Sequence, residues 1–150
     1  MMIFIYSILL IPFLQSSFGC NSGWTSYRGR CYFISHDQQS WVAAEGICLN
    51  LGGHLAEIND ERENNFLQHS LVDIVNKQAW VGGTDVGVEG DWFWALSKTD
   101  IYPPNYVNWQ PGEPNSWSGH DENCMDLRPH ALGWNDETCS VALNYICETL

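Results

Sequence analysis

Residues 113–147 read EPNSWSGHDENCMDLRPHALGWNDETCSVALNYIC, and this stretch is the most informative about the fold because it joins a polar loop to short strand-like segments. It begins with Glu113-Pro114-Asn115 and later contains Trp134-Asn135-Asp136. Short strand-like pieces, from Cys124 to Leu127 and from Asn144 to Cys147, alternate with residues that favour turns. Acids and amides beside short strands predict a binding site carried on a loop.

The oxygen-bearing side chains of this stretch suit a hard divalent cation. Ca²⁺ takes about six to eight oxygen ligands, mostly carboxylates and amide carbonyls. Carboxylates neutralise the ion, and the Asn carbonyls add ligands without further repulsion. The alternative is that acids and amides merely keep a proline-rich loop solvated. The side chains that supply such a shell are Glu113, Asn115, Glu122, Asn135 and Asp136.

The loop before these residues has no helical period. Four prolines lie between Pro103 and Asn123, and an irregular stretch of about 20 residues in a compact domain is usually functional. The Glu113–Pro114 bond is a candidate for cis geometry, since proline lowers the trans preference to about 1 kcal/mol. A cis bond would turn the carbonyl groups of Glu113 and Asn115 toward the same side.

Two helices are predicted upstream of the loop. The first begins after a Ser40 N-cap, with its apolar face at three- and four-residue steps, and ends at Gly52-Gly53. The second begins near Asn59 or Asp60 and places acids in its first turn, where the helix dipole favours them. The expected apolar positions are Trp41, Ala44, Cys48 and Leu51 in the first helix, and Phe66, Leu67, Leu71 and Ile74 in the second. Residues Ala79–Val81 and Trp92–Trp94 read as further short strands.

Composition restricts the compartment and the partners. The formal net charge of −12 argues against nucleic acid and against docking to an anionic membrane. Met1 to Leu14 carries no charged side chain and is too short for the ~30 Å core of a bilayer. We therefore expect residues 1–19 to be a signal peptide and residues 20–150 to be one secreted extracellular domain without membrane insertion. The alternative is an uncleaved anchor, because no Lys or Arg precedes the apolar run. Six cysteines fit such an oxidising location.

Taken together, these motifs resemble the C-type lectin-like domain in its long form. Glu113-Pro114-Asn115 matches the EPN signature, Trp134-Asn135-Asp136 the WND signature, and Trp80-Val81-Gly82-Gly83 resembles the WIGL core strand. The resemblance implies an α+β fold, with two helices flanking small antiparallel sheets and an irregular calcium-binding long loop. Six cysteines allow fifteen pairings; the family pattern implies Cys20–Cys31, Cys48–Cys147 and Cys124–Cys139.

The resemblance also implies a site. Glu113, Asn115, Glu122, Asn135 and Asp136 would ligate one Ca²⁺, and two vicinal hydroxyls of a sugar would complete its shell. Glu113, Asn115, Glu122 and Asn135 would bond those hydroxyls, because carboxylates only accept and amide NH₂ groups donate. EPN favours mannose, fucose, glucose or N-acetylglucosamine over galactose in this family. Trp117 is either a stacking face for the sugar or an anchor of the loop.

An auxiliary Ca²⁺ position is implied beside the first. Asp85 and Glu89 match two of its family ligands, with Glu122 shared. The acid that usually follows EPN is Ser116 in this chain. Either Asp121 would substitute as a ligand, or the auxiliary site is weak or empty. The alternative is that Asp85 and Glu89 belong to an ordinary acidic turn.

The expected function is a secreted calcium-dependent lectin of mannose type, without catalysis, that recognises microbial or host glycans in innate defence or agglutination. Avidity would come from non-covalent self-association, because the six cysteines are used internally. The alternatives are a galactose-binding EPN lectin and a protein-, mineral- or matrix-binding member of the same fold. A glycosidase using Glu113 and Glu122 is disfavoured, since it needs one raised and one normal pKa whereas calcium keeps both acids ionised.

Overall fold

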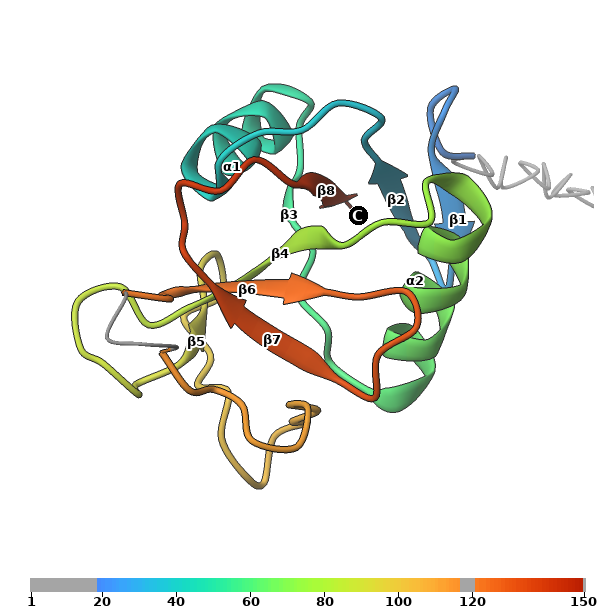
Figure 1. Ribbon diagram of the computed structural model, residues 1–150. Coiled ribbons are helices and arrows are strands. Elements are labelled where there is room, and N and C mark those ends of the chain that lie inside the picture. Colours follow the sequence, from blue (N-terminus) through green and yellow to red (C-terminus); the bar gives the residue numbers. More distant parts are fainter. Residues whose placement is uncertain (1–18, 117–120, 150) are drawn as a thin grey trace, which may run out of the picture.

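The computed structural model describes residues 19–116 and 121–149. This part of the chain forms eight strands and two helices, and Figure 1 shows their arrangement. The expected signal peptide falls almost wholly outside the described residues. The elements are β1 (Thr25–Tyr27), β2 (Arg30–Ile34), α1 (Trp41–Asn50), β3 (His54–Leu55), α2 (Glu61–Ile74), β4 (Ala79–Thr84), β5 (Phe93–Trp94), β6 (Cys124–Leu127), β7 (Trp134–Glu137) and β8 (Asn144–Thr149).

The strands form one connected sheet in the order β1-β2-β8-β4-β6-β7, with β3 added to β8 and β5 to β4. The last strand, β8, therefore lies in the middle and closes the domain. The α+β class with two helices is confirmed. One feature differs from the expected antiparallel sheets: β4 and β8 pair in parallel, Ala79 opposite Asn144 and Trp80 opposite Tyr145. Strand pairing of this range depends on the tertiary fold and leaves no local sequence signal.

Both helices begin at the predicted caps. The Ser40 side chain accepts from the Ala43 backbone N–H, and the Asp60 side chain accepts from that of Glu63, which satisfies free donors of each first turn. Two expected core positions are wrong: Leu51 is 46% exposed and Ile74 is 40% exposed. Leu51 follows the last turn of α1, and Ile74 ends α2, so each lies where its helix leaves the core.

Trp134 anchors the strand that carries the WND motif. Its ring is fully buried, and Trp94, Tyr106 and Trp109 contact it edge-on at centroid distances of 5.5–5.8 Å. Its indole N–H donates to Asn64 Oδ1 of α2 at 2.8 Å. A buried Trp N–H needs such an acceptor. This contact explains why Asn64, a polar residue on the inner face of α2, is buried.

The three disulfides are those that the family pattern implies: Cys20–Cys31, Cys48–Cys147 and Cys124–Cys139. Cys48–Cys147 ties α1 to the central strand β8. Cys124–Cys139 joins the start of β6 to the residues that follow β7. It therefore links the two ends of the β6–β7 hairpin, which carries Asn135 and Asp136. No cysteine is free in the described part of the chain.

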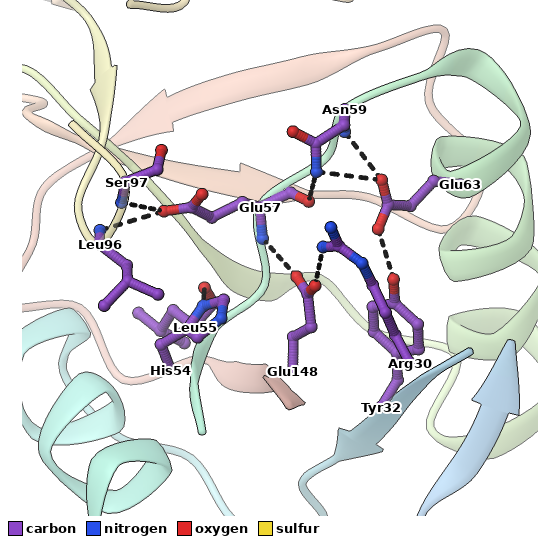
Figure 2. A network of polar contacts seen from close by, with 10 residues as sticks. All are labelled: Arg30, Tyr32, His54, Leu55, Glu57, Asn59, Glu63, Leu96, Ser97 and Glu148. Atoms are coloured by element: carbon purple, nitrogen blue, oxygen red, sulfur yellow. Dashed lines mark hydrogen bonds and ion pairs between the residues drawn. The ribbon is translucent and has the colours of Figure 1, made fainter. Parts of the chain in front are cut away.

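A cluster of buried polar residues lies among β2, β8, α2 and the segment after β3 (Figure 2). We call it the base network, and its acids are Glu57, Glu63 and Glu148. Glu148 bonds Arg30 and the Glu57 backbone N–H, the latter at 3.1 Å. Glu63 accepts from the Tyr32 hydroxyl and from the Asn59 backbone N–H. The Glu57 carboxylate reaches the backbone N–H groups of Leu96 and Ser97 at 3.0 and 2.9 Å. Each of these contacts joins two segments of the described chain, so the acids hold the elements together.

Candidate cation and saccharide site

The site is built on the β6–β7 hairpin. In this pair Met125 lies opposite Asp136 and Asp126 lies opposite Asn135. The loop docks against the outer edge of β7, where the Trp109 backbone pairs with Trp134. Gly133 permits this approach, because a Cβ there would overlap the Asn108 carbonyl oxygen. In Figure 1 the loop, yellow to orange, lies on the side of β6 and β7 away from α1.

All five predicted principal ligands line one cavity. Its volume is about 230 Å³, and its lining consists of Glu113, Asn115, Glu122, Arg128, Asn135, Asp136 and Glu137. Larger hollows exist elsewhere, including one of about 510 Å³ beside β5, but they do not gather these acids and amides. The structure thus brings together side chains that are up to 23 positions apart in sequence, from Glu113 to Asp136.

Asp136 connects the loop to the strand. Its Oδ2 accepts from the backbone N–H groups of Asn115 and Ser116, both at 2.8 Å. The Glu113–Pro114 bond is cis, as the sequence suggested. The other oxygen, Asp136 Oδ1, is buried and has no hydrogen-bond partner in the described part of the chain. One carboxylate therefore fixes the EPN loop and still presents a second oxygen to the site.

Glu113 stands beside Asp136 in the cavity. Burial, followed by the adjacent Asp136 carboxylate and by Glu122, raises the pKa of Glu113 from 4.5 to about 7. Glu113 Oε2 is likewise buried without a partner in the described residues. Crowded carboxylates with unpaired oxygens are costly on their own and are the ligands that a hard cation prefers. The donor set fits Ca²⁺, which would be held by these acids and by the Asn115 and Asn135 carbonyls.

Residues 19–116 and 121–149 contain no group of three His, Cys, Asp or Glu side chains that could hold a metal. The proposed shell therefore depends on its two amides as well as on its acids. The same residues include no helix long and apolar enough to cross a membrane.

The residues of the expected auxiliary site lie next to the EPN loop. Glu89 Oε1 accepts from the Ser116 hydroxyl at 2.7 Å. Asp85 Oδ2 accepts from the Gly90 backbone N–H at 2.7 Å, and its Oδ1 is buried without a partner among the described residues. Burial raises the pKa of Asp85. Ser116, in the place of the usual acid, thus bonds one of the expected ligands.

Asn135 does not lie as the sequence suggested for a sugar donor. Its Nδ2 donates to Asp126 Oδ2 at 3.0 Å and to the Asp136 backbone carbonyl. Both amide hydrogens are therefore engaged within the protein, and donation to a sugar hydroxyl would require one of these bonds to be exchanged. Trp117, the expected stacking residue, lies outside the described residues.

Sequence reasoning missed Asp126 and Arg128. Asp126 is fully buried, and Arg128 donates to it from Nε at 3.0 Å. Burial raises the pKa of Asp126, and Arg128 and Asn135 oppose that shift. The available signal was an aspartate inside the strand Cys124–Leu127 with an arginine two residues later. Polar residues also alternate with apolar ones in ordinary strands, so this signal is weak.

The comparisons with known proteins agree with this fold. Residues 37–149 match the model of the lectin C-type domain, and the chain belongs to this family. The family is one of carbohydrate-binding domains and not of enzymes, and its members generally bind Ca²⁺.

Among curated relatives, the chain is 32% identical to "Galactose-specific lectin nattectin" of Thalassophryne nattereri over 89% of this chain and 82% of that protein. Several other relatives are longer, and the chain spans about 40% of their length.

Two solved structures illustrate the range of similar domains. The carbohydrate-recognition domain of cow CD23, determined in the presence of a GlcNAc2Man3 oligosaccharide, is 32% identical, with a TM-score of 0.76 over 88% of this chain and 96% of that one. A calcium-independent type II antifreeze protein is also 32% identical, with a TM-score of 0.74 over 87% of this chain and 94% of that one. A protein of this similarity can therefore be calcium-independent.

Proposed function

We propose that this chain is a secreted, calcium-dependent lectin that binds a saccharide diol at the cavity between the EPN loop and β7. The observation that carries the proposal is the pair of buried, unpartnered oxygens on Glu113 and Asp136, which face a cavity shared with Asn115, Glu122 and Asn135. Carboxylate oxygens without hydrogen-bond partners are available to ligate a hard cation such as Ca²⁺. A cation with vacant positions then accepts two hydroxyl oxygens.

Mannose-type sugars are the proposed ligands. Glu113 supplies an acceptor and Asn115 a donor on the two sides of the diol, in the order that the EPN motif has in mannose-type members. Galactose is the competing candidate, because nattectin is described as galactose-specific. The engaged amide of Asn135 is a reason to measure both, since one of the four expected sugar contacts is already used within the protein.

The test is retention on immobilised mannose and on immobilised galactose, with Ca²⁺ and after its removal. We expect calcium-dependent retention on mannose. The double change Glu113→Gln and Asn115→Asp should shift the preference toward galactose. Equal retention with and without calcium contradicts the proposal. If the double variant keeps the sugar preference of the original protein, residues other than Glu113 and Asn115 set the selectivity.

A calcium-independent function is the second candidate. The calcium-independent antifreeze protein described above resembles this chain in fold about as closely as cow CD23 does, and its sequence identity to this chain is the same. The two candidates differ in one measurable property. A lectin of the proposed type takes up Ca²⁺ before it binds its ligand, whereas a domain that recognises ice or another protein surface in the manner of a calcium-independent member needs no ion.

The cellular setting follows from the same proposal. Export by the segment 1–19 would place the domain outside the cell, where recognition of microbial or host glycans is the proposed role in defence. One shallow site binds a monosaccharide weakly, so useful avidity would require non-covalent association of several copies. Sedimentation of the purified chain with and without Ca²⁺ measures that association.

A further inference from the structure

The proposed cation site depends on the direction in which the Asn135 amide faces. Its carbonyl oxygen can ligate a cation, and its nitrogen cannot. Asn135 lines the cavity and is only 8% exposed. A side-chain amide can rotate by half a turn unless its surroundings fix it, so an element of the protein must hold the oxygen toward the ion.

The contacts of Asn135 determine that direction. Nδ2 donates to Asp126 Oδ2 at 3.0 Å and to the Asp136 backbone carbonyl. The opposite orientation would place the amide oxygen against a carboxylate and a carbonyl, which both only accept. Two acceptors on the same side therefore exclude it. The Asn135 Oδ1 atom points away from Asp126.

Asp126 is placed for this task by the sheet. It lies directly opposite Asn135 in the β6–β7 pair, and it is fully buried. Arg128 donates to it from Nε at 3.0 Å and from Nη2 at 3.4 Å, which offsets the cost of a buried charge. Asp126 does not line the cavity. It therefore acts on the site through Asn135.

We propose that Asp126 is the positioning residue of the cation site: it holds the Asn135 amide nitrogen so that the carbonyl oxygen is presented to Ca²⁺, with Arg128 as its counterion. The inference rests on the proposed function. Partners of this kind change metal affinity by about 10–100-fold when they are removed. The role is distinct from that of the five ligands, since Asp126 would touch neither the ion nor the sugar.

The test compares Asp126→Ala with Asp126→Asn in the full chain, with calorimetric titration of Ca²⁺ alone. The alanine variant loses the acceptor for Asn135, so the Kd for Ca²⁺ should rise about 10-fold or more. The asparagine variant keeps an acceptor oxygen of the same shape and should recover most of that loss. Recovery by Asn separates orientation of the amide from the charge of Asp126.

Glu148→Ala is the matched control, because Glu148 is also a buried carboxylate paired with an arginine, in the base network of Figure 2. Both alanine variants should unfold at lower temperature. Only Asp126→Ala should bind Ca²⁺ more weakly when all variants are titrated below their unfolding transitions. An equal change in both variants would show general destabilisation and overturn the inference.

A measurement on the unchanged protein covers the case in which Asp126→Ala does not fold. The side-chain N–H signals of Asn135 should exchange with solvent much more slowly than those of Asn115, because both Asn135 hydrogens are bonded inside the protein. Fast exchange overturns the inference, as does a Kd for Asp126→Ala within about twofold of the original. If the unchanged chain takes up no Ca²⁺ at all, the proposed function itself fails, and the two failures are distinguishable.

Discussion

The domain contains two groups of acids with buried carboxylate oxygens, and the groups differ in how those oxygens are hydrogen-bonded. In the base network, the carboxylates of Glu57, Glu63 and Glu148 accept from backbone N–H groups, a tyrosine hydroxyl and Arg30. At the site, Glu113 and Asp136 each keep one buried oxygen without a partner in the described chain. Both groups lie in a protein of net charge −12, so net charge does not explain the difference.

The difference separates acids that hold the fold from acids that hold a ligand. A buried carboxylate whose oxygens are all bonded stabilises the contacts around it, and removing it leaves its donors unpaired. A buried carboxylate with an unpaired oxygen costs free energy until a cation arrives. The base network should therefore matter for stability and the site group for calcium, and the following predictions test that division.

The largest expected effect concerns the disulfides of the two regions. Cys48–Cys147 spans 99 positions and Cys124–Cys139 spans 15. Closing a longer loop removes more entropy from the unfolded chain, so losing the first bond should cost about 4–5 kcal/mol and losing the second about 3 kcal/mol. Urea unfolding of the paired Cys→Ser variants measures both. Loss of the second bond should also weaken Ca²⁺ binding; a larger cost for the shorter loop would contradict the comparison.

The next effect is on the site alone. Asp136→Asn keeps an acceptor for the Asn115 and Ser116 N–H groups but removes a charged ligand. Ca²⁺ affinity should fall about 100-fold, or about 2.7 kcal/mol, while the metal-free protein unfolds at no lower temperature. Calorimetric titration and thermal unfolding give the two quantities. Glu148→Gln should show the reverse pattern, with unchanged affinity and reduced stability. If both variants lost calcium affinity and stability to the same extent, the division between site acids and fold-stabilising acids would be wrong.

The smallest effect is a pH dependence. The pKa of Glu113 is raised to about 7 in the metal-free protein, so its contribution to stability is present below its ordinary 4.5 and is lost as the pH rises through about 7. Calcium requires the ionised form, so stabilisation by calcium should grow over this interval. We expect the difference in Tm with and without Ca²⁺ to widen from about pH 5 to about pH 8.

The base network supplies the internal control for that measurement. Burial raises the pKa of Glu148 as well, but this shift acts on the protein with and without calcium and cancels in the difference. Glu113→Gln should flatten the dependence. A constant difference in Tm across the range would show that Glu113 does not titrate against the metal.

Much of the fold was predictable because local signals carry it. Ser40 and Asp60 cap their helices as expected, and the strands predicted to begin at Ala79, Trp92 and Cys124 begin within one residue of those positions. The strand at Ala79 continues to Thr84, three residues further than predicted. The strand Trp134–Glu137 was not predicted as a strand, because it consists mostly of residues with low strand propensity. Its structure comes from Trp134, whose burial among other aromatic rings and bond to Asn64 outweigh that propensity.

The order of residues established which chemical groups are present: acids and amides suited to a cation in a proline-rich loop, six cysteines in the family pattern, and capping residues for two helices. Folding set how those groups are arranged. It placed Asp126 opposite Asn135, turned the Asn135 nitrogen inward, and left one oxygen each on Glu113 and Asp136 unpaired. The physical reason is that side-chain types and helix caps act over a few residues, whereas strand register and the pairing of buried polar atoms join residues that only folding brings together.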